Sequence, residues 1–246
     1  MLAACGGETK MLDIVMLKLL WFWSHANYGL VAALMVCVAV PFAMAQSNSG
    51  SHSQFQPPIP DALGNERFAD LLKPGSLPEL RLGSSGARTT IVAYTSVSCG
   101  LCGHFQRKIL PVLQSKYIDK GDMQLIIRPF PLDRIAAASA MLTYCVKRPD
   151  SYKFLWALLE RQQDWLTRKG QDLRSGLARI FKEYGGDEKS FEACLGRQEL
   201  LKKIMDARNR ADGTFGVLET PTFFINGKPL VNPRSVAKFE KIIRAE

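Results

Sequence analysis

The stretch Thr89-Thr-Ile-Val-Ala-Tyr-Thr95-Ser-Val-Ser-Cys99-Gly-Leu-Cys102 leads from an uncharged run into a pair of cysteines. Residues 89–95 are mostly β-branched, aromatic or apolar, which predicts a buried strand. A helix is expected from Cys99 to Tyr117, with a kink at Pro111. Its apolar side is formed by Phe105, Ile109, Val112 and Leu113. Met123–Phe130 predicts a second strand, so strand, helix and parallel strand form a βαβ unit.

The position of the two cysteines at the start of a helix predicts their chemistry. A helix N-terminus offers unpaired N–H groups and a partial positive charge, which stabilise a thiolate and lower its pKa. Cys99 is therefore expected to be an accessible nucleophile. Cys102, one helical turn later, is expected to be more buried and to resolve a mixed disulfide. A CxxC pair at a strand-to-helix junction indicates thiol–disulfide exchange.

The βαβ unit is followed by a long helical region and then by a second β region. Helices are expected near residues 135–147, 150–166, 172–184, 188–195 and 199–211. A strand at Thr222–Ile225, an Asn226-Gly227 type I′ turn and a return strand at 229–231 form a hairpin. A terminal helix is expected at 235–244, and an edge strand within 77–82. The chain is therefore an α/β protein with a helical insertion.

The N-terminal residues 1–45 resemble a secretory signal peptide. Lys18 precedes an apolar stretch that ends at Ala43-Met44-Ala45, a small-residue cleavage pattern. Met16 is a plausible start, which would leave residues 1–15 outside the natural protein. The alternative is an uncleaved membrane anchor, but the apolar stretch is short for a span of about 20 residues. Residues 46–64 are polar and Pro-rich and are expected to form a linker. Export, to the periplasm, is therefore expected.

The charge and the cysteine count narrow the function classes. The chain of 246 residues has a net charge of +9, but it has no nucleic-acid-binding motif, so no nucleic-acid partner is expected. The region after residue 45 holds four cysteines, Cys99, Cys102, Cys145 and Cys194, an even number that suits disulfides in an exported protein. Neither a metal nor another cofactor is expected. A Cu(I) site at Cys99 and Cys102 is a less favoured alternative.

The chain resembles the thioredoxin superfamily, and within it the exported DsbA-like branch. The resemblance rests on the strand before Cys99-Gly-Leu-Cys102, on Phe105, on the helical insertion and on Glu219-Thr220-Pro221-Thr222 with its following strand and Asn226-Gly227. It implies a thioredoxin fold with a helical domain, residues 133–212, inserted between the βαβ unit and the ββα unit. The thioredoxin domain would then comprise residues 65–132 and 213–246.

The resemblance also implies site residues. Thr220 and Pro221 would form a cis-proline loop that faces the CxxC pair and binds extended substrate. Gly100 and Leu101 replace the Pro-His of strongly oxidising members, which implies a milder oxidant, and Ala93 stands where many relatives have a buried acid. His104 is a further modulator or an ordinary surface histidine. Once the active pair is assigned, Cys145 and Cys194 remain to pair with each other, and some DsbA-like proteins carry such a second disulfide. Its role is structural, or it tunes the active site, or the two thiols stay reduced.

These inferences predict a protein thiol–disulfide oxidoreductase. Its substrates would be unfolded or partly folded exported proteins with cysteines, and a membrane redox partner would reset its active site. It would most simply donate disulfides, as an oxidase. A disulfide isomerase or reductase remains the main alternative.

Overall fold

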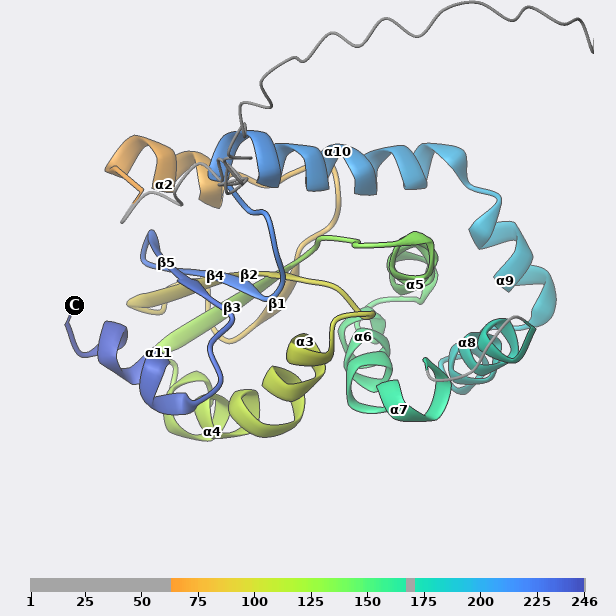
Figure 1. Ribbon diagram of the computed structural model, residues 1–246, viewed down its shortest axis with the longest axis horizontal. Helices are drawn as coiled ribbons and strands as arrows, with labels where there is room; N and C mark the ends of the chain where they lie inside the picture. The colour runs from red at the N-terminus through yellow and green to blue at the C-terminus, as the bar shows by residue number, and fades with distance from the viewer. Residues whose placement is uncertain (1–62, 167–170, 246) are drawn as a thin grey trace, which may run out of the picture. The chain divides into compact units, whose positions relative to one another are not determined.

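The computed structural model describes residues 63–166 and 171–245. In this part of the chain a five-stranded mixed sheet has the strand order β1-β3-β2-β4-β5. The strands are β1 Leu80–Leu82, β2 Thr89–Thr95, β3 Met123–Pro129, β4 Thr222–Ile225 and β5 Lys228–Val231. β2 and β3 run parallel, while the other neighbouring pairs are antiparallel. The predicted βαβ unit and the C-terminal hairpin are therefore confirmed, and they share one sheet (Figure 1).

The hairpin turn shows why the sequence Asn-Gly stands there. Asn226 and Gly227 have φ angles of 45° and 85°, as a type I′ turn requires. The Asn226 side-chain oxygen also accepts a hydrogen bond from the Thr90 N–H at 2.8 Å, which ties the turn to β2.

The two faces of the sheet carry two separate apolar clusters, because successive strand residues point to opposite sides. Ile91 and Ala93 pack with the cysteine-bearing helix and with Phe239 of α11 (Val236–Ile243). Val92 and Tyr94 pack with α10 (Gln198–Phe215), and Phe68 and Leu72 of α2 (Asn65–Leu72) lie against the same cluster. Figure 1 shows α2 and α10 on one side of the sheet and α3, α4 and α11 on the other.

The cysteine-bearing helix is built from α3 (Gly100–His104), α4 (Leu110–Leu113) and two wide turns, Phe105–Ile109 and Gln114–Ile118. In the first wide turn the Leu110 N–H bonds to the Phe105 carbonyl, five residues back. Pro111, which follows, has no N–H to offer to the helix. The predicted helix is therefore present, and its irregularity takes the form of π-type turns on both sides of Pro111.

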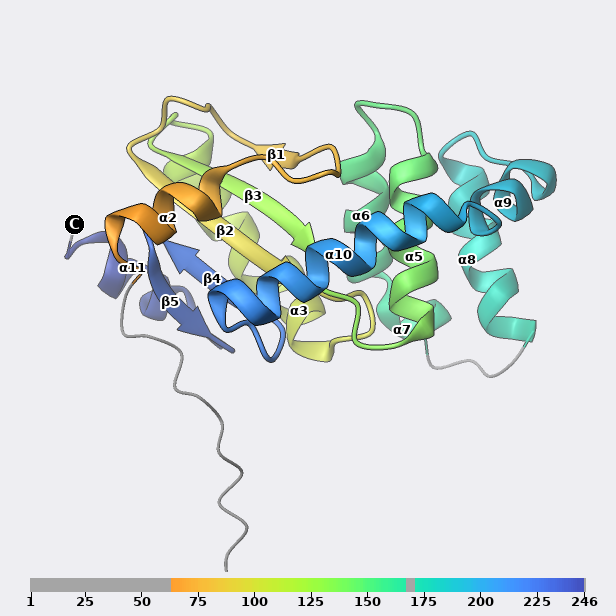
Figure 2. The same cartoon turned by 90° about the horizontal axis from the view of Figure 1, so that it is seen from above.

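The helical insertion follows β3. Its elements are α5 Arg134–Cys145, α6 Ser151–Glu160, α7 Gln162–Trp165, α8 Gln171–Glu183 and α9 Glu188–Leu195. The predicted helix 150–166 is interrupted at Arg161, where φ is −97° and ψ is 21°. The helix α10 then runs from the insertion back over the sheet (Figure 2): its Ile204 belongs to the core of the insertion side, and its Phe215 to the core above Val92.

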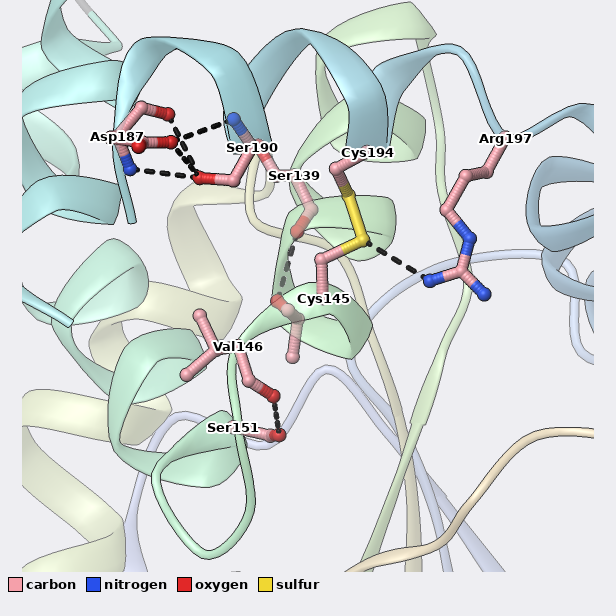
Figure 3. Close-up of a disulfide and its surroundings, with 9 residues drawn as sticks. Ser139, Cys145, Val146, Ser151, Asp187, Ser190, Cys194 and Arg197 are labelled. Carbon is pink, nitrogen blue, oxygen red and sulfur yellow. Dashed lines mark hydrogen bonds between the residues drawn. A yellow bond between two sulfur atoms is a disulfide. The ribbon is translucent and has the colours of Figure 1, made fainter. Parts of the chain in front are cut away.

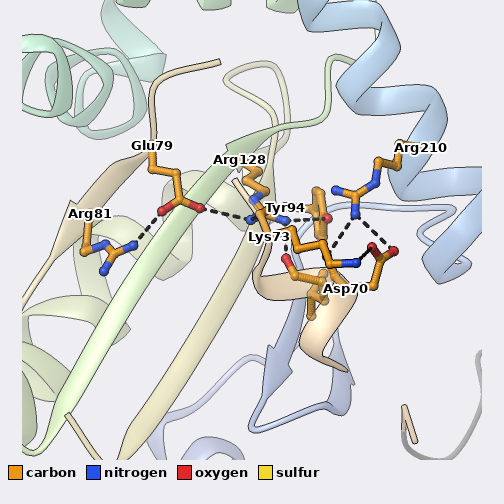
Figure 4. A network of polar contacts seen from close by, with 8 residues as sticks. Asp70, Lys73, Glu79, Arg81, Tyr94, Arg128 and Arg210 are labelled. Atoms are coloured by element: carbon orange, nitrogen blue, oxygen red, sulfur yellow. Dashed lines mark hydrogen bonds and ion pairs between the residues drawn. The ribbon is translucent and has the colours of Figure 1, made fainter. Parts of the chain in front are cut away.

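A half-buried arginine ties the first described helix, α2, to the sheet (Figure 4). Arg128 on β3 pairs with Glu79 at 3.0 Å and donates to the carbonyl of Leu71 at 2.7 Å. Arg210 on α10 pairs with Asp70 on α2 at 3.0 Å. These contacts fix α2, a helix that sequence patterning does not predict because its eight residues bury only Leu71.

The predicted signal peptide, residues 1–45, and nearly all of the predicted linker lie outside the described residues. In the part that is described, no helix combines the length and the apolar character needed to cross a bilayer.

Candidate active site

Cys99 lies at the carboxyl edge of the sheet, where β2 gives way to α3. It is the N-cap of α3, with extended backbone angles of −85° and 118°, and its Sγ accepts a hydrogen bond from the Cys102 N–H at 3.3 Å. The turn before it is closed by a bond from the Cys99 N–H to the Ser96 carbonyl at 3.1 Å. The sulfur therefore sits where the unpaired N–H groups of the helix end converge.

The two thiols differ sharply in exposure and in pKa. Both are free, with Cys99 half-buried and Cys102 only 1% exposed. A hydrogen bond from the Cys102 thiol lowers the pKa of Cys99 to about 6, against the opposing effect of its partial burial; the Thr220 side chain and the N–H groups of Cys102 and Leu101 act in the same direction. Burial, and then the adjacent Cys99 sulfur, raise the pKa of Cys102 well above its ordinary value. Cys99 is thus a thiolate near neutral pH, and Cys102 keeps its proton.

The Thr220-Pro221 loop faces Cys99 from the opposite strand. Tyr94, near the end of β2, pairs with Thr222 at the start of β4, which brings the loop beside the cysteines. The Thr220–Pro221 peptide bond is cis, and the Cys99 thiol donates to the Thr220 carbonyl at 3.1 Å. The Thr220 hydroxyl is buried and, among the described residues, makes no regular hydrogen bond.

The residues expected to modulate the pair have different surroundings. Gly100 is exposed and has open space around it, while Leu101 is half-buried. His104 donates from Nε2 to the Arg234 carbonyl at 3.2 Å, so its ring is engaged with the segment before α11. Ala93 is 3% exposed and belongs to the same apolar cluster as Cys102, so this position offers no carboxylate beside the buried thiol.

Phe105 fixes the cysteine-bearing helix on the sheet. Its ring lies 4.7 Å from that of Phe223 on β4 and 5.6 Å from that of Phe239 on α11, measured between ring centroids. Aromatic contacts of this kind give large buried area with defined geometry. The phenylalanine after the CxxC pair therefore acts as the packing anchor of the active-site helix.

Cys145 and Cys194 are joined in a disulfide that links the end of α5 to the end of α9 (Figure 3). Their Cα atoms are 6.1 Å apart. Cys194 is 2% exposed, and the Arg197 guanidinium approaches the Cys145 sulfur at 3.8 Å. The disulfide closes a loop that contains most of the insertion.

Sequence reasoning missed one residue at the site, Gln162. Its side-chain N–H group donates to the carbonyls of Val97 at 2.7 Å and Cys99 at 2.8 Å. It reaches the site from α7, more than sixty positions along the chain, so no local pattern around the cysteines could have indicated it.

The described residues hold no group of three or more His, Cys, Asp or Glu side chains placed to bind a metal ion together. The groups that contact the Cys99 sulfur are a hydrogen-bond donor, the Cys102 N–H, and an acceptor, the Thr220 carbonyl.

Comparison with known proteins agrees with this arrangement. Residues 76–245, more than half of the chain, match the family model described as Thioredoxin. The crystal structure of α-DsbA1 from Wolbachia pipientis has a TM-score of 0.64 and 27% identity, covering 72% of this chain and 94% of that chain. Oxidised BdbD from Bacillus subtilis has the same fold, with a TM-score of 0.60 and 21% identity over 68% of this chain and 91% of that chain.

The sequence relatives have names that refer to disulfide chemistry. Disulfide bond formation protein D of Bacillus subtilis is 25% identical over 178 residues, which cover 67% of this chain and 75% of that protein. A Rickettsia typhi relative named as a protein-disulfide oxidoreductase is 24% identical over 152 residues, 61% of this chain and 55% of its own length. The chain thus spans about half the length of the Rickettsia relatives it matches. By its matched residues and its fold, the chain belongs to the thioredoxin family, and its structural neighbours include DsbA proteins.

Proposed function

We propose that the chain is a protein thiol–disulfide oxidoreductase that exchanges the Cys99–Cys102 disulfide with cysteines of other proteins, acting as a disulfide donor. One observation carries the proposal: at a helix start, an accessible thiol with a lowered pKa stands between the Cys102 N–H and the Thr220 carbonyl, beside a buried thiol with a raised pKa. This asymmetry is what directional exchange requires.

The reaction begins from the oxidised protein. A substrate thiolate attacks the Cys99 sulfur, a new S–S bond forms there, and Cys102 leaves and takes up a proton because its pKa is high. A second substrate thiolate then attacks the substrate sulfur of the mixed disulfide and releases Cys99 as a thiolate. Two electrons pass from the two substrate thiols to the protein, which ends as the reduced pair. Its return to the disulfide needs an oxidant, which we assign to a membrane redox partner.

Pro221 and Thr220 are proposed to bind the substrate. The loop that they form lies against the sulfur that substrate must reach. An extended peptide could lie beside it as a short additional strand. Cys145 and Cys194 are proposed to serve stability.

The setting is proposed to be outside the cytoplasm. The leader-like residues 1–45 and the Ala43-Met44-Ala45 pattern support export, and the periplasm is the compartment proposed. Disulfides persist in such oxidising compartments, which suits the pair at Cys145 and Cys194. Exported proteins with unpaired cysteines are then the substrates.

The deciding experiment is the reduction potential of the Cys99–Cys102 pair, measured by equilibration in glutathione buffers. A value near the ~−120 mV of a strong oxidant supports a disulfide donor. A value near the ~−270 mV of thioredoxin contradicts it and indicates a reductase or isomerase. The potential of a Cys145→Ala/Cys194→Ala variant is the control, since it reports the active pair alone.

A further inference from the structure

Gln162 holds both ends of the turn that carries Cys99. One side-chain nitrogen donates to the Val97 carbonyl before the turn and to the Cys99 carbonyl at its end, at 2.7 and 2.8 Å. The residue is 5% exposed, so these bonds are formed away from water. A buried amide that satisfies two backbone carbonyls is costly to remove, because the carbonyl oxygens lose a partner that water does not replace.

The element that presents Gln162 is itself firmly fixed. Trp165, on the same short helix, is fully buried, and its indole N–H donates to the Leu158 carbonyl at 2.9 Å. Arg161, at the break between α6 and α7, pairs with Glu183 of α8 at 2.6 Å. The amide of Gln162 is thus held by the helical insertion.

A second side chain crosses the same interface in the opposite direction. Arg107 extends from the cysteine-bearing helix and donates to the carbonyl of Leu159, near the end of α6, at 2.9 Å. Gly103 leaves space for this arrangement: a methyl group added there would overlap the side-chain oxygen of Gln162 and come within 2.7 Å of the Arg107 guanidinium. Gly103, Arg107 and Gln162 therefore form a contact between the insertion and the active-site helix, here called the turn clamp.

The turn clamp bears directly on the Cys99 sulfur. The carbonyl that Gln162 holds belongs to Cys99, whose Cα–Cβ bond sets where the sulfur lies between the Cys102 N–H and the Thr220 carbonyl. The same carbonyl accepts from the N–H groups of Cys102 and Gly103 at 3.1 and 3.2 Å. If the turn rotates, the sulfur moves away from the Cys102 N–H that it accepts from at 3.3 Å, and its thiolate loses the stabilisation that this N–H provides.

We propose that Gln162 is a positioning residue, through which the helical insertion holds the Cys99 sulfur in place for thiol–disulfide exchange. The catalytic meaning of this proposal rests on the proposed function. The ionisation of Cys99, which is the main measurement, can be followed without any exchange activity, so a failure of the positioning role of Gln162 is distinguishable from a failure of the proposed function. The insertion is thereby a part of the active site, in addition to any role in binding substrate.

The test compares Gln162→Leu, which keeps a similar volume and removes the donors, with Gln198→Leu, an exposed glutamine on α10. The Cys99 pKa is measured in the full reduced chain by thiolate absorbance and by the pH dependence of alkylation. The expected result is an upward shift of roughly one unit in Gln162→Leu and no shift in Gln198→Leu. The reduction potential should become more negative in Gln162→Leu alone, because a less stable thiolate disfavours the reduced form. A folded Gln162→Leu protein with the wild-type Cys99 pKa overturns the proposal.

Gly103→Ala perturbs the turn clamp from the active-site helix instead of from the insertion. It replaces Gln162→Leu as the test variant if Gln162→Leu does not fold. The added methyl group displaces the flexible end of Gln162, so the Cys99 pKa is expected to rise in Gly103→Ala as well. In the double variant Gly103→Ala/Gln162→Ala the overlap with Gln162 is gone, and the pKa is expected to match that of Gln162→Ala alone. An unchanged Cys99 pKa in Gly103→Ala, or shifts that simply add in the double variant, contradicts the role assigned to Gln162.

Discussion

The thiol of Cys99 donates a hydrogen bond of 3.1 Å to the carbonyl oxygen of Thr220, a residue 121 positions away in the sequence. This contact joins the two halves of the thioredoxin fold, because one residue caps the helix after β2 and the other precedes β4. It also places Cys99, the proposed nucleophile, against the loop that is proposed to bind substrate. The chemistry of the site therefore depends on the sheet register that aligns Tyr94 with Thr222.

The asymmetry of the two thiols predicts opposite results for two substitutions. Cys99→Ser should reduce dithiol turnover to the uncatalysed rate, because the half-buried Cys99 sulfur is the one that substrate can reach, whereas Cys102 is buried. Reduced Cys102→Ser should instead accumulate mixed disulfides when Cys99 attacks a substrate disulfide, because the thiol that displaces the substrate in that direction is gone. Insulin reduction and non-reducing gels with a cysteine-containing peptide measure both effects. Full turnover by Cys99→Ser would falsify the proposed mechanism.

The lowered pKa of Cys99 predicts a pH-dependent stability of the reduced protein. In the folded state the pKa is about 6, and in the unfolded chain it returns towards 9. Between these values the unfolded state binds the extra proton, so stability rises with pH. The contribution is complete above about pH 9 and is lost as pH falls through about 6. As pH rises from 6 to 8, the melting temperature of the reduced protein should rise relative to that of the oxidised protein. In the reduced Cys99→Ser variant this rise of stability with pH should be absent. If the variant keeps the rise, ionisation of Cys99 is not its cause.

The Thr220 side chain is predicted to tune the nucleophile. It contributes to the lowered pKa of Cys99, and its hydroxyl makes no regular hydrogen bond within the described part of the chain. Thr220→Val keeps the shape and removes the hydroxyl. We expect the Cys99 pKa to rise by about half a unit to one unit, with a stability change below about 1 kcal/mol. Thiolate absorbance and urea unfolding measure the two quantities. A Thr220→Ser variant, which keeps the hydroxyl, should retain the low pKa.

The disulfide between Cys145 and Cys194 predicts a large stability effect. The two residues are 49 positions apart, and closing a loop of this length is worth ~4 kcal/mol in the chain-entropy model. Cys145→Ala/Cys194→Ala should therefore lower the free energy of unfolding by roughly that amount. Urea unfolding of the double variant, with the active pair held in one redox state, gives the number. A loss below about 1 kcal/mol would show that the unfolded chain is already constrained or that the bond adds strain.

Much of the fold could be predicted from sequence because its strands are strongly patterned. β2 and β4 have the predicted bounds, since their residues are uninterrupted, apolar or β-branched, and flanked by turn residues. The Asn226-Gly227 turn follows from its need for two positive φ angles. The helix α2 could not be predicted, because a short polar helix becomes stable only through partners such as Arg210, which are distant in sequence.

The site shows the same limit. Cys99 and Cys102 could be identified because their spacing and their place after a strand are visible locally. Gln162 could not, because a buried glutamine has no pattern of its own until the fold brings Val97 and Cys99 to it. The π-type turn before Pro111 was likewise predicted only as a kink, because sequence indicates the missing N–H and not how the backbone adapts.

The helix α10 limits how the molecule can flex. It has 18 residues, about 27 Å of continuous helix at 1.5 Å per residue. The domain boundary predicted at residue 212 falls inside α10. The chain therefore returns from the insertion to the sheet along one uninterrupted helix. A hinge there would require the helix to bend. Because Ile204 packs in the core of the insertion side and Phe215 in the core above Val92, any movement of the insertion relative to the sheet must either bend α10 or disturb its packing at one of these ends.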